Sequence, residues 1–169
     1  DIEFDTNPDL LGFNNGIFDF NEEIFRPARF DDYVTWSCGW DFRPLGFGMK
    51  YTEDGAVKTV ASIDDEDTAR MSELKDVLTK ILPDEKVRDL VLYIFASGLS
   101  GRAIEKFFVF NGNGRNGKGL LDEMMYYMLG DYCVNVSPKI LTENARNQCS
   151  GNANPEKAKL NKKRYVFMK

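Results

Sequence analysis

Residues 112–118 combine glycines and a lysine at the spacing of a phosphate-binding loop. Four residues separate Gly112 from Gly117, and Lys118 follows at once. In a Walker A loop this spacing lets backbone N–H groups converge on phosphate oxygens, and the lysine adds a positive charge near the outer phosphates. A helix beginning at the lysine would add the positive end of its dipole. The pattern predicts a site for a polyphosphate.

The same glycines fit two other nucleotide motifs. Gly112, Gly114 and Gly117 have the spacing of the dinucleotide fingerprint, which also requires an acidic residue at the end of the next strand, about 20 residues on. Asp131 comes nearest but precedes the next apolar run. A protein-kinase glycine loop needs a valine two places after its last glycine, and that place is Gly119. The Walker interpretation is favoured, with a dinucleotide site and a glycine turn without ligand as alternatives.

Gly119 departs from the Walker pattern, which has serine or threonine after the lysine to ligate Mg²⁺ through its hydroxyl. Either the glycine eases packing at the helix start, or the metal is held by water and by an acid outside this chain. The sequence does not separate these two explanations.

Three segments with helical spacing are expected around the loop. Apolar residues recur every three or four positions over residues 71–81, 87–95 and 120–128. Pro83 separates the first two segments, and Gly130 ends the third. The methionines of the third segment are interpreted as core residues.

Several short runs predict strands. Residues 107–110 are all apolar and predict a buried strand leading into the loop, while residues 132–136 and 164–169 predict two more. A short helix is expected over residues 155–161 and an exposed loop over residues 144–153.

The N-terminal third is expected to be rich in β-structure. Turn signals at Asn15-Gly16 and at Asn21-Glu22 predict hairpins, and residues 32–40, β-branched and aromatic, predict another strand. Residues 43–66 contain one proline, three glycines and a run of acids, and are interpreted as loop or linker.

Composition limits the possible classes of protein. With 169 residues, 43% of them hydrophobic, the chain can form a real core, and no run approaches the ~18 apolar residues of a membrane span. Three distant cysteines, Cys38, Cys133 and Cys149, and no histidine indicate neither a disulfide framework nor a typical zinc site, so no metal ligand is assigned. Without histidine, serine–histidine and cysteine–histidine hydrolase mechanisms are excluded.

Charge divides the chain unevenly. Net charge is −10 over residues 1–66, −1 over residues 67–101 and +6 over residues 102–169. We therefore predict a β-rich N-terminal domain with linker, a helical hairpin, and the first part of a nucleotide-binding domain, with these boundaries.

Two groups of side chains have alternative interpretations. The aromatic group could stack on nucleic-acid bases, but core packing is favoured; it comprises Phe30, Tyr33, Trp36, Trp40 and Phe42. The basic group could face a phosphate backbone, but a solvated helix face is favoured; it comprises Lys157, Lys159, Lys162, Lys163 and Arg164.

The loop and its surroundings resemble the superfamily 3 helicases of the poxvirus-type and satellite-phage-type primase-helicases. The resemblance rests on the sequence from Asn111 to Leu120, on residues 96–101 before it, and on residues 129–132 and 163–167 after it. Residues 11–19 and 25–27 are similar, less specifically, to the domain that precedes the helicase in these proteins.

This resemblance implies an α/β chain that ends with the start of a P-loop AAA+ domain, from an ATP-driven hexameric DNA helicase that requires Mg²⁺ and works in the host cytoplasm or at the viral replication site. Lys118 would act catalytically and contact the outer phosphates. The implied nucleotide-binding residues are Gly112, Asn113, Gly114, Arg115, Asn116, Gly117, Lys118, Gly119 and Leu120. The acidic metal site and the arginine finger of the family are expected beyond Lys169, so the chain is expected to be inactive by itself.

A second function remains open, namely a module that binds nucleotide or assembles subunits without hydrolysis. Gly119 and the missing acids favour the module, whereas the intact loop and Lys118 favour the motor. A nicotinamide-binding enzyme is the third possibility.

Overall fold

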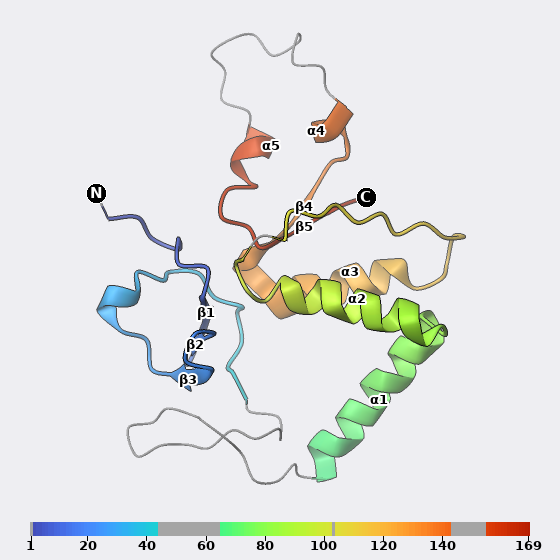
Figure 1. Cartoon of the computed structure of the whole chain (residues 1–169), viewed down its shortest axis with the longest axis horizontal. Coiled ribbons are helices and arrows are strands. Elements are labelled where there is room, and N and C mark those ends of the chain that lie inside the picture. The colour runs from blue at the N-terminus through green and yellow to red at the C-terminus, as the bar shows by residue number, and fades with distance from the viewer. Residues whose placement is uncertain (1, 44–64, 103, 143–154) are drawn as a thin grey trace.

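The computed structural model describes residues 2–43, 65–102, 104–142 and 155–169 as a mixed α/β arrangement of two small sheets and several helices (Figure 1). The N-terminal sheet lies on one side of the helices, and the second sheet lies beside the helix that follows the glycine loop. None of the helices in these ranges is both long and apolar enough to cross a membrane.

The N-terminal sheet is antiparallel and has the order β1-β2-β3. Its strands are β1 (Leu10–Phe13), β2 (Gly16–Asp19) and β3 (Ile24–Arg26). Phe13 pairs with Gly16, which leaves a two-residue loop of the hairpin type between β1 and β2. The predicted hairpins are confirmed.

Residues 32–40 do not form the predicted strand. A short 3₁₀ helix, η1 (Phe30–Asp32), precedes an irregular segment. The Asp5 carboxylate accepts hydrogen bonds from the backbone N–H groups of Thr35 at 2.6 Å and Trp36 at 3.0 Å. Backbone groups that bond to a side chain are not available for a ladder, which explains why a β-prone sequence stays irregular here.

The predicted helical hairpin is confirmed as α1 (Asp65–Ile81) and α2 (Glu85–Ser97). Asp84 caps α2, since its carboxylate accepts a hydrogen bond from the N–H of Val87 at 3.0 Å. Asp65 and Glu66, which the sequence assigned to the linker, form the first turn of α1 together with Asp67, and negative charge is favourable there. The rest of the predicted linker, residues 44–64, lies outside the described residues.

The region after the glycine loop contains α3 (Lys118–Leu129), η2 (Gly130–Tyr132), β4 (Cys133–Val136), α4 (Lys139–Thr142), α5 (Pro155–Ala158) and β5 (Tyr165–Met168). It has the predicted helix and the two predicted strands, but the helix predicted over residues 155–161 ends at Ala158, and η2 and α4 were not predicted. β4 and β5 pair in parallel with Cys133 opposite Tyr165, and α3 packs against both strands. The predicted loop over residues 144–153, with Cys149, lies outside the described residues.

Residues 107–110 are not the buried strand that the sequence predicts. The segment has no strand assignment, and the side chains of Phe107 and Val109 are 71% and 76% exposed. A strand requires a neighbour that accepts and donates backbone hydrogen bonds. No such neighbour is present among the described ranges, so the apolar run stays unpaired.

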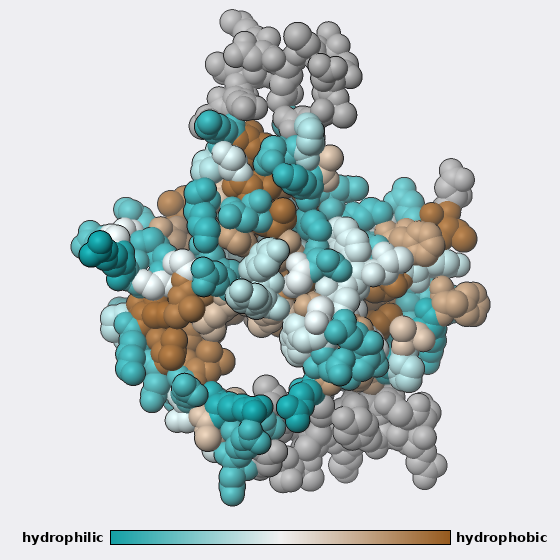
Figure 2. Space-filling view, turned by 180° about the vertical axis from the view of Figure 1, so that it is seen from behind, coloured by the Kyte–Doolittle hydropathy of each residue, from teal (hydrophilic) through white to brown (hydrophobic). Residues whose placement is uncertain are grey.

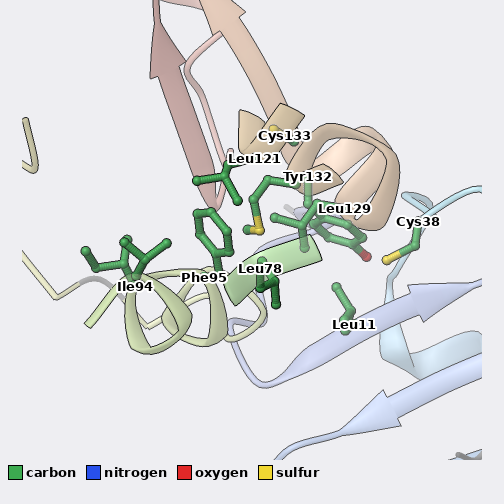
Figure 3. Close-up of a cluster of buried hydrophobic side chains, with 11 residues drawn as sticks. Leu11, Cys38, Leu78, Ile94, Phe95, Leu121, Leu129, Tyr132 and Cys133 are labelled. Atoms are coloured by element: carbon green, nitrogen blue, oxygen red, sulfur yellow. The ribbon is translucent and has the colours of Figure 1, made fainter. Parts of the chain in front are cut away.

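One core joins the N-terminal sheet to the helices (Figure 3). Its buried members are Leu11, Cys38, Leu78, Val91, Ile94, Phe95, Leu121, Met125, Leu129, Tyr132 and Cys133. Met125 is fully buried, which confirms the packing role predicted for the methionines of α3. Burial raises the pKa of the Cys38 thiol to about 12 and that of Cys133 to about 11, so both thiols stay protonated.

Polar contacts also tie the N-terminal sheet to later parts of the chain. The Tyr132 hydroxyl accepts a hydrogen bond from the N–H of Gly12 at 2.9 Å and donates one to the carbonyl oxygen of Trp36 at 3.0 Å. Arg164 donates to the carbonyl oxygens of Leu10 and Leu99. Residues 2–43 are therefore anchored on the second half of the molecule.

Candidate nucleotide-binding site

The glycine loop leads directly into α3. Gly117 is the residue before the helix and has φ +85°, in the left-handed region that glycine adopts without strain. Its carbonyl oxygen accepts the N–H groups of Leu120 at 3.0 Å and Leu121 at 3.2 Å. No side chain caps this helix start, so the positive end of the dipole is open to an anion.

Lys118 folds back over the loop. Its ammonium donates hydrogen bonds to the carbonyl oxygens of Gly112 at 3.0 Å and Asn113 at 3.2 Å, and to the side-chain oxygen of Asn116 at 2.8 Å. The structure therefore places the predicted lysine in the centre of the predicted loop, where three oxygens hold its charge.

The loop glycines differ in what surrounds them. A Cβ at Gly117 would lie 2.8 Å from Cγ1 of Ile81, and one at Gly112 would lie 2.6 Å from Nδ2 of Asn116. A Cβ at Gly114 or Gly119 would meet nothing within 4 Å. Close packing thus favours glycine at position 117, whereas the atom nearest to Gly112 is the end of the exposed Asn116 side chain, which can move.

The open space at Gly119 bears on why the usual hydroxyl is absent. Because a side chain there would meet no neighbour, the need for close packing does not explain the glycine. Of the two explanations that the sequence left open, easier packing at the helix start is therefore not supported.

The remaining predicted residues lie at the rim of the loop. Arg115 adopts a left-handed conformation with φ +62° and is exposed, and Leu120 is exposed on the first turn of α3. In the described part of the chain, neither residue forms a hydrogen bond with Lys118. Both stay predicted binding residues, whereas Gly112, Asn113 and Asn116 accept hydrogen bonds from the lysine.

A groove of about 980 Å³ lies beside the loop. Lys118 and Gly119 line it together with the extended residues 107–110, part of β5, and Asp122 of α3. The groove joins the helix start to the end of β5. Its size is within the range of small-molecule sites.

Asp122 is a polar residue of this site that the sequence interpretation did not identify. Partial burial raises the pKa of its carboxyl group, while the positive charge of Lys169 opposes this shift. The available signal was its position, three residues after Gly119 and four after Lys118, which places all three on one side of a helix.

The aromatic group does not form one stacking platform. Trp36 packs edge-on against Tyr132, Trp40 against Phe13, and Phe42 stacks on Phe25 at 4.5 Å. Phe30, by contrast, is 92% exposed, so the prediction of core packing fails for this residue.

The basic group is divided as well. Lys157, Lys159 and Lys162 are exposed, as predicted for a solvated face. Lys163 instead lies 3.9 Å from the centre of the Trp36 ring and donates to the carbonyl oxygen of Asp131. Arg164 is engaged in anchoring the N-terminal sheet.

Comparison with known proteins finds one matching family and several similar viral proteins. Residues 2–83 match the family described as D5 N terminal like. The chain is 34% identical over 155 residues to a protein of Acanthamoeba polyphaga mimivirus named as a helicase, covering 91% of this chain and 14% of that protein. A protein of Invertebrate iridescent virus 3, also named as a helicase, is 30% identical over 92% of this chain and 15% of its own length.

Primase D5 of fowlpox virus is 30% identical over 166 residues, which is 98% of this chain and 19% of that protein. The chain thus spans about one seventh to one fifth of the length of these curated relatives.

Proposed function

From the D5 N-terminal domain that residues 2–83 carry, and from the homology to viral proteins named helicase or primase D5, we propose that this chain is part of an ATP-dependent DNA helicase of a viral replication protein. In this proposal residues 112–120 bind the phosphates of ATP at the start of a P-loop AAA+ domain of superfamily 3. The parent protein hydrolyses ATP, and the remaining catalytic groups come from its other parts.

The conformation of Lys118 is the observation that carries the proposal. A cation held by three loop oxygens beside an uncapped helix start is a suitable partner for a triphosphate. The donor set fits ATP, because the ammonium and the helix N-terminus offer positive charge on one side of an open groove.

The residues of the loop bind and orient the nucleotide. The ammonium of Lys118 exchanges loop oxygens for phosphate oxygens, and the crowded Gly117 keeps the backbone in the curved form that this contact needs. Mg²⁺, when bound, neutralises charge on the phosphates.

DNA and a ring of subunits, a hexamer, are the proposed partners of the parent protein, which acts in the host cytoplasm or at the viral replication site. Proteins named helicase or primase act on nucleic acid. Lys157, Lys159 and Lys162 are exposed, although Lys159 pairs with Glu156 at 2.8 Å and Lys162 donates to the carbonyl oxygen of Phe4, so a phosphate backbone would compete with these contacts.

A second candidate function, an assembly module that binds nucleotide without turnover, is favoured by the outer face of α2. Leu90 and Tyr93 are 53% and 62% exposed there, and Val87 lies one turn before Leu90. Apolar residues remain on the surface of the molecule (Figure 2), and such residues can form contacts between subunits.

The experiment that tests the proposal measures ATP binding and hydrolysis by the parent-length protein, with and without single-stranded DNA. Lys118→Ala is expected to lose at least tenfold in ATP affinity and to abolish turnover, because it removes the ammonium that the loop oxygens hold beside the start of α3. Lys86→Ala, an exposed lysine on α2, is the matched control and should behave as the unaltered protein.

DNA-stimulated turnover that disappears in Lys118→Ala would support the motor. ATP binding without turnover, together with stable oligomers, would support the assembly module. Equal turnover in Lys118→Ala would contradict the role of the loop in both, and binding of NAD in place of ATP would indicate the dinucleotide alternative.

A further inference from the structure

Asp122 lies on α3 three positions after Gly119, where phosphate loops usually have a hydroxyl. Residues three apart on a helix are neighbours on one face. Side chains in helices lean toward the N-terminus, so a residue covers the turn before its own Cα. An aspartate at position 122 therefore faces the turn that contains Gly119.

The space between these two positions is open. A Cβ at Gly119 would meet nothing within 4 Å, and Lys118, Gly119 and Asp122 line the same groove. A carboxylate on this face has room to act on a group bound at the loop.

The Asp122 carboxyl group has no fixed partner within the described parts of the chain. Neither a hydrogen bond nor an ion pair holds it within these ranges, and the positive charge of Lys169 lowers its pKa against the effect of burial. Its partial burial disfavours the charged form, and a nearby cation would reverse this effect. A metal ion at the loop would supply that cation.

We propose that Asp122 replaces the hydroxyl missing at Gly119 and binds the hydration shell of the divalent cation that accompanies ATP. This inference rests on the proposed nucleotide function. The sequence suggests that an acid outside this chain helps to hold the metal. The present inference gives part of that role to Asp122.

The chemistry of Mg²⁺ agrees with such a role. Mg²⁺ loses water reluctantly and is usually held by one or two carboxylates, phosphate oxygens and several waters. A carboxylate one turn further along the helix reaches the hydration shell without ligating the ion itself. Groups in this position typically change metal affinity by about tenfold or more.

The test uses Mn²⁺, which prefers the same oxygen ligands and gives an electron paramagnetic resonance signal when free. Mn²⁺ affinity of the full chain is titrated in the presence of ATP, and ATP affinity is measured separately in EDTA. Asp122→Asn keeps the shape of the side chain and removes its charge. Glu123→Gln is the matched control, because it removes the same charge from the neighbouring exposed position on α3.

Asp122→Asn is expected to weaken Mn²⁺ binding about tenfold, while ATP binding in EDTA and the thermal unfolding midpoint stay near those of the unaltered chain. Glu123→Gln should leave the Mn²⁺ affinity unchanged. The double variant Gly119→Ser with Asp122→Asn should recover most of the affinity, since the open space at Gly119 accepts the serine hydroxyl.

An unchanged Mn²⁺ affinity in Asp122→Asn, or equal losses in both single variants, would overturn the role of Asp122 while leaving the nucleotide site standing. If the unaltered chain binds ATP neither with Mn²⁺ nor in EDTA, the proposed function itself fails and this inference fails with it. Measuring ATP binding under both conditions separates these two results.

Discussion

Arg26 is the residue whose charge the N-terminal sheet encloses most completely. Its side chain is 6% exposed and forms hydrogen bonds with both oxygens of Asp32, at 2.7 and 2.8 Å, and with Asp19 at 3.4 Å. A buried pair of this kind contributes little by itself, but removing one partner leaves an uncompensated charge.

We expect Arg26→Met to lower the free energy of unfolding by about 3–5 kcal/mol, because Asp19 and Asp32 then face each other without a cation. Denaturant unfolding measures the change. Arg70→Met is the control, since Arg70 and Glu66 form an exposed pair worth only about 0.3–0.5 kcal/mol. Similar losses of unfolding free energy in Arg26→Met and Arg70→Met would contradict the larger role given to the buried pair.

The same cluster gives the stability a pH dependence. The hydrogen bond from Arg26 holds the pKa of Asp32 below its usual range, and partial burial opposes this shift. A lowered pKa in the folded state stabilises the fold above the ordinary aspartate value, about pH 3.9, and this contribution disappears as the pH falls through the folded value. In Arg26→Met this acid-side loss should shrink, which unfolding at pH 6 and pH 3 would measure.

The junction between α1 and α3 is the element contact on which the glycine loop depends. Gly117 begins the turn into α3 and lies against Ile81, the last residue of α1. The loop is thus supported by a helix that precedes it by more than thirty residues.

Gly117→Ala should destabilise the chain by about 1–3 kcal/mol, because the new Cβ would lie 2.8 Å from Ile81 and φ is +85°. Gly114→Ala is the matched control within the same loop, where a Cβ meets nothing within 4 Å. Thermal unfolding of the two variants compares them directly. A stable Gly117→Ala would show that α1 can move away from the loop.

The elements differ in how well the sequence predicts them. The three helices follow from apolar spacing and from local signals such as Asp84 and Gly130, so their prediction needs no distant partner. Residues 107–110 have a strand-like sequence, yet a strand exists only through pairing, which local sequence cannot supply.

The candidate site shows the same division. The motif predicted the loop glycines and Lys118, because their spacing is itself the signal. The contact of Gly117 with Ile81 and the place of Asp122 in the groove depend on how helices pack, and no pattern within the loop contains that information.

At the scale of the whole molecule, Tyr132 connects the N-terminal sheet with the part that follows α3. Its hydroxyl bonds to Gly12 and to Trp36, and its ring lies 4.5 Å from the guanidinium of Arg164. Burial raises the pKa of this hydroxyl to about 12, so it remains a donor at neutral pH.

We expect Tyr132→Phe to cost about 1–3 kcal/mol, since it leaves the buried N–H of Gly12 without an acceptor and the carbonyl of Trp36 without this donor. The rate of hydrogen exchange should increase at Gly12 and change little within α2. Tyr127→Phe, on the exposed side of α3, is the control and should change neither stability nor exchange. Unaltered exchange at Gly12 in Tyr132→Phe would show that the two parts are held by other contacts.

The contacts that anchor the N-terminal sheet determine when this sheet can complete its folding during synthesis. Leu10 and Gly12 are synthesised more than a hundred residues before Tyr132 and Arg164, the residues that fix them. Contacts between such distant positions form late and slowly. The N-terminal sheet therefore waits for its final packing until Arg164 has been synthesised, and its apolar strands stay without their full cover until then.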